Sequence, residues 1–382
     1  MRTIIHRLYN LSLAVFSALF LLQTCSLLGQ SSAYAFNPSA GDFSKDLDTD
    51  VRLLSYNTHM DFISDPSRDD AFNRILSAIG PDVIVFQEIN SSLSESSIRS
   101  RLDSVLPYGA TWEIHFGMSD GRRNVLASRY PLSMTRTDTN PPSSSRGVTI
   151  GLVDLPDGAH FKDLYIMGVH LKAMSDPESE AKRQKSCDAI ACWMGDARDA
   201  PEAQHNYISL GSDTPMIVMG DFNFYSEHPQ PEVTLRTGDI QDNGTYGPDV
   251  KGDWDITDIT DTKPENPYNV DPDTWPSDTE YPYSRIDRFY YTDSASTVAN
   301  SFILNTLSMN SEQLAAAGLE QNDTHENYSS DHLPVVMDIR IGIGTIRINF
   351  QPYTSAAPSG YMKDWGQNYG DEGQSGCDFG WQ

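Results

Sequence analysis

Residues 216–224, MIVMGDFNF, constrain the fold more than any other part of the sequence. Four consecutive apolar residues after Pro215 indicate a strand in the core of the protein. Gly220 then allows a tight turn. Asp221 and Asn223 follow two positions apart, so their side chains emerge on the same side of an extended segment. An isolated Gly-Asp-x-Asn is most often a strand end with an Asx-type turn, so a functional interpretation needs other strands that end in the same way.

Polar residues also stand at other predicted strand or turn ends. These are Asn57 after VRLLSY, Glu88 after DVIVF, His170 after LYIMGV, Asp287 in SRIDRFYY and the pair Asp331 and His332 before LPVVM. Helices are predicted over residues 69–79 and 178–198, where apolar residues recur at helical spacing. Strands are predicted over residues 51–56, 82–86, 124–128, 149–153, 164–169, 216–219, 286–291 and 335–341. Strands that alternate with helices and end in polar residues are typical of an α/β fold.

The first 35 residues have the pattern of a secretory signal peptide. A basic start is followed by an apolar run over residues 11–22 and by Ala-Tyr-Ala at residues 33–35. The run is shorter than the ~20 apolar residues that a membrane span needs. We therefore expect cleavage after Ala35 and a secreted protein, extracellular or periplasmic, with no transmembrane segment in the mature chain.

The remaining chain divides by composition. Residues 36–50 are a short polar leader, residues 51–344 are expected to form one domain, and residues 345–382 are a Gly-, Ser- and Pro-rich tail. Residues 239–282 lack apolar periodicity and are predicted to be an acidic surface insertion without calcium-site spacing. The net charge of −26 repels polyanions at long range. It disfavours a nucleic-acid binder that relies on a basic face but does not exclude a nuclease.

Seven segments, in the same order, resemble motifs of the endonuclease/exonuclease/phosphatase superfamily of DNase I-like proteins. They are LLSYNTH, DVIVFQE, NVLASRYPL, MGVHLKA, MIVMGDFN, SRIDRFYY and SSDHLPVVM. The resemblance implies an α/β (α+β) fold, a four-layer sandwich of two mainly antiparallel β-sheets flanked by helices. The tail resembles the start of a malectin-like carbohydrate-binding module, which implies a glycan contact. A segment this short either packs on the preceding domain or is a truncated β-sandwich.

The resemblance also implies a divalent-metal site. Magnesium prefers hard oxygen ligands and keeps several waters, so one or two carboxylates are sufficient. By resemblance the ligands are Glu88, Asn57 and Asp331, and the cation is Mg²⁺, with Mn²⁺ or Ca²⁺ as alternatives.

Catalytic and substrate-binding roles carry over in the same way. Asp221 would be the base that positions the attacking water, with Asn223 holding it. His332, charged through Asp287, would hydrogen-bond a phosphate oxygen, and His170 would contact the phosphate or the leaving group. A lone histidine at a strand end is usually structural. Arg122, Arg123 and Lys172 would bind substrate phosphates, or would be ordinary surface charges.

Together with the expected signal peptide, the resemblance implies a monomeric, secreted, metal-dependent phosphodiesterase that hydrolyses phosphodiester bonds by direct attack of water. The preferred substrate is nucleic acid. The alternatives are a sphingomyelinase or other phospholipid phosphodiesterase, a phosphomonoesterase, and, from a different class, a non-catalytic surface-binding module.

Overall fold

The computed structural model describes residues 36–60, 62–138, 146–199, 208–225, 227–276 and 284–341. It also describes four short strands, β13 (Ile348–Phe350), β14 (Met362–Asp364), β15 (Gly370–Asp371) and β16 (Asp378–Phe379). The expected signal peptide and most of the tail lie outside the described residues. Within the described part, none of the helices has the length and apolar character needed to cross a membrane.

Two six-stranded sheets form the centre of the domain. The first has the order β11-β12-β1-β2-β4-β3 and the second the order β5-β6-β7-β8-β10-β9. The strands of the first sheet are β1 (Val51–Met60), β2 (Val83–Asn90), β3 (Glu113–Ser119), β4 (Arg122–Ser128), β11 (Ser296–Ile303) and β12 (Val335–Ile341). Those of the second are β5 (Leu132–Asp138), β6 (Val148–Val153), β7 (Leu164–His170), β8 (Met216–Asp221), β9 (Thr260–Asp261) and β10 (Asp287–Tyr291).

Each sheet contains a single parallel pair, β1–β2 in the first and β7–β8 in the second. All other neighbouring strands in the two sheets are antiparallel. A helix connects each parallel pair, as a crossover between parallel strands requires. The predicted sandwich of two mainly antiparallel sheets is confirmed.

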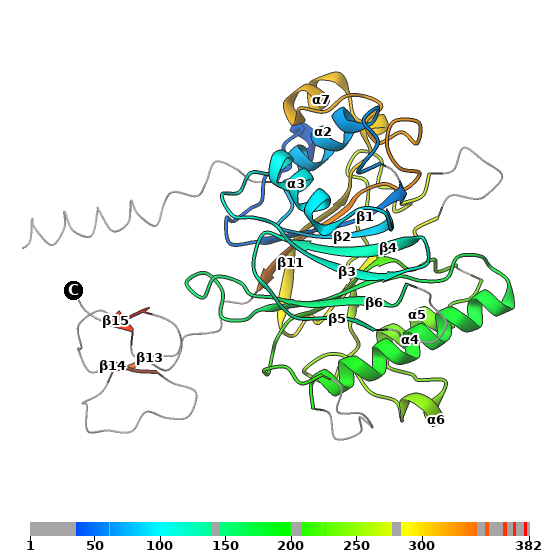
Figure 1. The fold of residues 1–382 in the computed structure, drawn as a ribbon. Coiled ribbons are helices and arrows are strands. Elements are labelled where there is room, and N and C mark those ends of the chain that lie inside the picture. The colour runs from blue at the N-terminus through cyan, green and yellow to red at the C-terminus, as the bar shows by residue number, and fades with distance from the viewer. Residues whose placement is uncertain are drawn as a thin grey trace, which may run out of the picture.

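Helices cover the outer face of each sheet and complete the four layers (Figure 1). The helices α2 (Asp69–Ile79), α3 (Glu95–Val105) and α7 (Ser311–Ala317) lie over the first sheet. The helices α4 (Pro177–Ala197), α5 (Gln230–Thr237) and α6 (Asn243–Tyr246) lie over the second. Two short 3₁₀ turns, η1 (Pro38–Ala40) and η2 (Thr306–Ser308), also belong to the described chain.

Strand residues alternate between the two faces of each sheet, and both faces are buried. In β8, Met216 and Val218 belong to the apolar core beneath α4, whereas Ile217 and Met219 belong to the core between the sheets. A strand that is covered on both sides needs apolar residues at every position. The continuous run MIVM in the sequence is the result.

The segment expected as a surface insertion contributes to both packing and the second sheet. Tyr246, Val250 and Ile259 are buried in the core beneath α4. Strand β9 pairs with β10, and the Arg285 guanidinium holds the Asp261 carboxylate at that edge through two hydrogen bonds. The segment therefore reaches from the outer helical layer to the strand that carries Asp287.

Candidate active site

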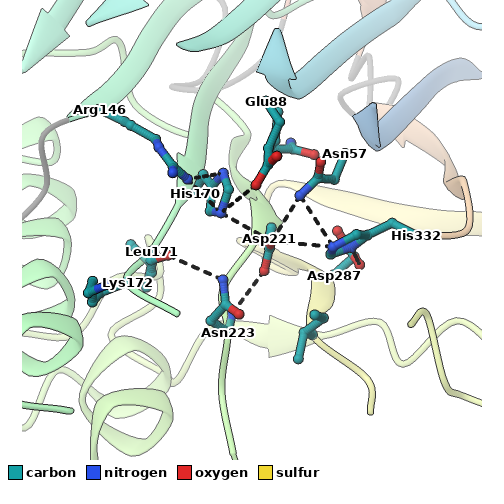
Figure 2. A network of polar contacts seen from close by, with 12 residues as sticks. Asn57, Glu88, Arg146, His170, Leu171, Lys172, Asp221, Asn223, Asp287 and His332 are labelled. Atoms are coloured by element: carbon teal, nitrogen blue, oxygen red, sulfur yellow. Dashed lines mark hydrogen bonds and ion pairs between the residues drawn. The ribbon is translucent and has the colours of Figure 1, made fainter. Parts of the chain in front are cut away.

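The polar residues predicted in or beside the core strands come together in one network of contacts (Figure 2). A cavity of about 270 Å³ opens there. The candidate site residues that line it are Glu88, His170, Asp221, Asn223, Asp331 and His332. Side chains separated by more than 240 positions in the sequence therefore share one cavity wall.

The parallel ladder of β7 and β8 brings His170 and Asp221 together. Pairing is unbroken from Tyr165 opposite Met216 to His170 opposite Asp221. Gly220 has φ of +144°, and a Cβ atom there would lie 2.0 Å from the Val169 carbonyl oxygen. Only glycine allows this close approach of the two strands. As a result, His170 Nε2 lies 3.3 Å from Asp221 Oδ2.

Asp221 is a buried carboxylate, 2% exposed, with several hydrogen-bond donors around it. The Asn57 Nδ2 donates to Oδ2 at 3.2 Å, and the Asn223 backbone N–H donates to Oδ1 at 3.1 Å. Burial, followed by the nearby charge of Asp287, raises the pKa of Asp221 to about 7. A carboxyl group with this pKa can accept a proton near neutral pH.

His332 is held by Asp287. Its Nδ1 lies 2.8 Å from Asp287 Oδ2, and its Nε2 lies 3.3 Å from Asn57 Nδ2 and 3.9 Å from Asp221 Oδ2. Burial alone would lower the pKa of His332, but the charge and hydrogen bond of Asp287 outweigh it and raise the pKa to about 10. The structure thus favours an imidazolium that points its second nitrogen into the cavity.

His170 has the opposite electrostatic environment. The ring is buried, and Arg146 Nη1 lies 2.5 Å from Nδ1 and 2.7 Å from Nε2. Burial and then the positive charge of Arg146 lower the pKa of His170 well below its usual value. His170 is therefore uncharged at neutral pH, while His332 is charged.

Glu88 reaches the cavity through an irregularity in the first sheet. The pairing of β2 with both β1 and β4 shifts around this residue, which has a φ of +58°. Bulges of this kind redirect side chains next to active sites. One carboxylate oxygen, Oε2, pairs with Arg122, and the other, Oε1, lies 3.9 Å from His170 Nε2.

The predicted metal ligands form a hard, oxygen-rich donor set. Glu88 and Asp331 line the same cavity. The buried Asn57 side chain contacts two other lining residues, Asp221 and His332, through Nδ2, and its Oδ1 accepts a hydrogen bond from the His59 backbone N–H. Carboxylate and amide oxygens are the ligands that Mg²⁺ prefers. The residues present therefore fit a divalent cation.

A second cluster of potential ligands consists of Asp221, Asp287 and His332, whose ligand atoms lie within 4.8 Å of one another. These distances are short enough for the three side chains to bind one cation. However, Nδ1 of His332 is committed to Asp287 at 2.8 Å, which leaves only Nε2 of this ring to face Asp221. The cluster therefore offers one imidazole nitrogen and two buried carboxylates, whereas Glu88 and Asp331 offer carboxylates that line the cavity.

Of the remaining predicted site residues, Asp331 lines the cavity, whereas Arg123 and Lys172 are not among its lining residues. Asp331 Oδ1 pairs with His59 Nδ1 at 3.3 Å, and its Oδ2 accepts a hydrogen bond from Trp275 Nε1 at 3.4 Å. Arg123 donates to the Ser91 carbonyl oxygen and lies over the ring of Phe116. Lys172 is exposed beside Leu171, whose carbonyl oxygen accepts a hydrogen bond from Asn223 Nδ2.

Sequence reasoning missed several residues of the site. Arg146 follows a Pro- and Ser-rich stretch that carries no periodic signal. Met174, Tyr225, Trp275 and Ile286 line the apolar side of the cavity. Ile286 lies in a predicted strand and Tyr225 follows the MGDFNF segment, but nothing in the sequence indicates that these residues converge on one cavity.

Comparison with known proteins identifies the family model described as "Endonuclease/Exonuclease/phosphatase family", which matches residues 54–332. A comparison with curated proteins finds no match. Among solved structures, the chain is similar to D. rerio TDP2 complexed with a single-strand DNA product, with 15% identity, a TM-score of 0.46 and coverage of 77% of this chain and 100% of that chain. It is also similar to the human Nocturnin catalytic domain with a bound sulfate anion, with 16% identity, a TM-score of 0.45 and coverage of 78% and 96%.

Proposed function

The chain belongs to the endonuclease/exonuclease/phosphatase family, whose members are metal-dependent phosphoric ester hydrolases, and on this premise we propose that it is a secreted, magnesium-dependent nuclease. The observation that carries phosphodiester hydrolysis is the convergence of a buried carboxylate, a charged His–Asp pair and a second carboxylate on one cavity.

Asp221 is the general base. Its Oδ2 faces the cavity between the two histidines, and its Oδ1 is fixed by the Asn223 backbone N–H. A carboxylate that is held in one orientation can align an attacking water and take its proton. The raised pKa of Asp221 makes it a stronger base than an exposed aspartate.

His332 stabilises negative charge on the phosphate. The imidazolium is fixed through Nδ1 by Asp287, so the Nε2 proton is directed to the region in front of Asp221. A fixed donor with a positive charge is most effective where charge increases in the transition state. His170 is uncharged and can donate one hydrogen bond to a phosphate oxygen, which supports a contact role for it.

Glu88, Asn57 and Asp331 would hold the divalent cation. When it is bound, such a cation neutralises phosphate charge and stabilises the leaving oxygen. The carboxylate of Glu88 is suited to this because it is directed into the cavity by the bulge and keeps Oε1 free of Arg122.

Nucleic acid is the favoured substrate because cationic side chains gather at this end of a strongly acidic chain. Arg122 pairs with Glu88, Arg146 contacts His170, and Lys172 is exposed close by. Guanidinium groups suit phosphate oxygens. With a net charge of −26, a local cluster of this kind is where a polyanion can approach.

A phospholipid phosphodiesterase is the second candidate. Met174 lines the cavity with 59% of its surface exposed, next to Tyr225 and Trp275. An exposed apolar side chain at the rim could contact a lipid chain.

A substrate panel tests both candidates. Plasmid DNA, RNA, sphingomyelin vesicles and bis-nitrophenyl phosphate are each incubated with the protein, with Mg²⁺ or with a chelator, and with Asp221→Ala as the blank. We expect cation-dependent hydrolysis of DNA or RNA and of the small diester. Hydrolysis of sphingomyelin alone would contradict the nuclease and support the second candidate. Failure of all four substrates would contradict phosphodiester hydrolysis.

Secretion is tested separately. Expression with the full sequence, followed by mass spectrometry of protein outside the cytoplasm, should give a chain that begins at Phe36. This residue packs against Phe302 in the domain, with ring centroids 5.2 Å apart. A cytoplasmic protein that retains residues 1–35 would contradict export.

A further inference from the structure

Thr274 connects the acidic segment 239–282 to the His–Asp pair of the site. Its side chain is buried, with 1% exposure. Its hydroxyl donates to Asp287 Oδ2 at 2.7 Å and accepts hydrogen bonds from the backbone N–H groups of Ile286 and Asp287, at 3.1 and 3.0 Å. Nothing in the sequence around Thr274 indicated a role in the site.

The direction of the hydroxyl proton follows from these contacts. A threonine hydroxyl has one proton and two acceptor lone pairs. Because two backbone N–H groups point at the oxygen, the single proton is left for Asp287. The backbone N–H groups of Ile286 and Asp287 therefore fix the direction of the hydrogen bond that Thr274 donates to the Asp287 carboxylate.

Two donors converge on the same carboxylate oxygen. Asp287 Oδ2 receives the Thr274 hydroxyl at 2.7 Å and His332 Nδ1 at 2.8 Å. The other oxygen, Oδ1, is buried and has no hydrogen-bond partner among the described residues. The Thr274 hydroxyl and His332 Nδ1 therefore hold the carboxylate through the same oxygen, and Thr274 is the partner that does not itself face the cavity.

The backbone of Thr274 also connects the two halves of the pair. The Leu333 N–H donates to the Thr274 carbonyl oxygen at 2.8 Å, one residue after His332, and the Thr274 N–H donates to the Ser284 carbonyl oxygen at 3.1 Å. Thr274 therefore contacts both the segment that carries Asp287 and the segment that carries His332.

We propose that Thr274 is a positioning residue for hydrolysis, and that its hydroxyl orients the Asp287 carboxylate so that His332 Nε2 faces Asp221. The proposal rests on the proposed function for its kinetic consequence only. Because the orientation matters most when charge increases on the phosphate, loss of the hydroxyl should lower kcat more than it raises KM.

Three variants test the role of the hydroxyl. Thr274→Val keeps the shape of the side chain but removes the hydroxyl, and Thr274→Ser restores it. Thr292→Val is the matched control, because Thr292 is equally buried and its hydroxyl accepts a hydrogen bond from the Met216 N–H at 3.0 Å, at the other end of β8. We expect Thr274→Val to lower kcat about ten-fold or more with little change in KM, as removal of a hydrogen bond to a charged group predicts. The kcat values of Thr274→Ser and Thr292→Val should stay within about two-fold of that of the unmodified protein.

Proton NMR provides a readout that does not need substrate. The His332 Nδ1 proton, assigned through its loss in Asp287→Asn, should give a downfield resonance in the unmodified protein and in Thr274→Ser and Thr292→Val. It should shift or broaden in Thr274→Val. An unchanged resonance, or equal kcat values for Thr274→Val and Thr292→Val, would overturn the proposal. If the unmodified protein hydrolyses no phosphoester, the proposed function fails, and the NMR result alone decides the role of Thr274.

Discussion

The two sheets contain the same unit, a parallel strand pair joined by a helix, but the strand pairing around the site residues differs between the two units. In the first, β1–α2–β2, the pairing becomes irregular after Asn57, and Glu88 adopts a positive φ. In the second, β7–α4–β8, pairing is regular up to His170 opposite Asp221. The bulged unit supplies a partly accessible carboxylate, with 14% of the Glu88 side chain exposed, whereas the regular unit supplies a buried one.

This difference separates two chemical tasks. A carboxylate that binds a cation must stay ionised and reachable, and the irregular ladder turns Glu88 towards the cavity. A general base needs a raised pKa, and the regular ladder keeps Asp221 in the core, where burial raises it. We infer that the first unit supplies a ligand for the divalent cation, Glu88, and that the second supplies the general base, Asp221. The following predictions test this division.

Asp221→Asn should have the largest effect. It preserves the size of the side chain but removes the base, so kcat should fall by about 10³-fold at saturating cation. The measurement is steady-state hydrolysis of the small diester. Asp154→Asn, at an exposed aspartate after β6, is the control and should retain full activity. Retention of more than a tenth of the activity in Asp221→Asn would contradict the role of the base.

Gly220→Ala should test the regular ladder itself. An added Cβ would meet the Val169 carbonyl oxygen at 2.0 Å, at a φ of +144°. We expect a loss of about 3 kcal/mol in the free energy of unfolding, measured in urea. Two controls separate the causes: Gly121 has a φ of +106° with nothing within 4 Å, and Gly158 has open space and no positive φ. Gly121→Ala should cost about 1 kcal/mol and Gly158→Ala almost nothing. Equal losses in all three variants would show that the close approach of the strands is unimportant.

How much of the fold the sequence predicts depends on where a strand lies. All eight predicted strands are interior strands of the two sheets, whereas the missed strands β3, β5, β9 and β11 are the four edges. An interior strand is buried on both faces and has a continuous apolar run, as in MIVM. An edge strand such as β3 is mostly half-buried and lacks that run. The missed helix α3 likewise buries only Ile98 and Leu102.

The same distinction applies to the site. His170 and Asp221 were predictable because they are the last residues of core strands, and Asn57 because it follows an apolar run within β1. Arg146, Trp275 and Thr274 were not, because their contacts connect loops to distant strands. The bulge at Glu88 was also invisible, since a positive φ at a glutamate has no sequence signal. The order of the motifs identified the site residues in the core strands. The loop residues that contact them are determined by tertiary packing alone.

Glu88→Gln should sharpen the assignment of the first unit. It removes one negative charge from the expected cation site and leaves Asp221 and His332 in place. We expect the apparent affinity for Mg²⁺ to fall about ten-fold or more, with much of the activity recovered at high Mg²⁺. The test is activity against Mg²⁺ concentration, together with Mn²⁺ binding followed by electron paramagnetic resonance. A fall in kcat that Mg²⁺ cannot restore, with unchanged Mn²⁺ binding, would show that Glu88 does not bind the cation and would instead indicate a role in proton transfer.

The smallest expected effect concerns the pH dependence of stability in the metal-free protein. The pKa of His332 is raised from 6.5 to about 10, through Asp287 and against the effect of burial. Because the folded-state pKa is the higher one, the charged pair stabilises the fold fully below pH 6.5, and this stabilisation is lost as the pH rises towards 10. We expect the difference in unfolding free energy between the unmodified protein and His332→Gln to decrease by about 1 kcal/mol over this window. The measurement is urea unfolding in chelator at several pH values. His325→Gln, in an exposed turn, is the matched control and should show no comparable trend. A difference that is constant across the window would mean that His332 is not held charged by Asp287, and the site would then lack the charged hydrogen-bond donor that faces Asp221.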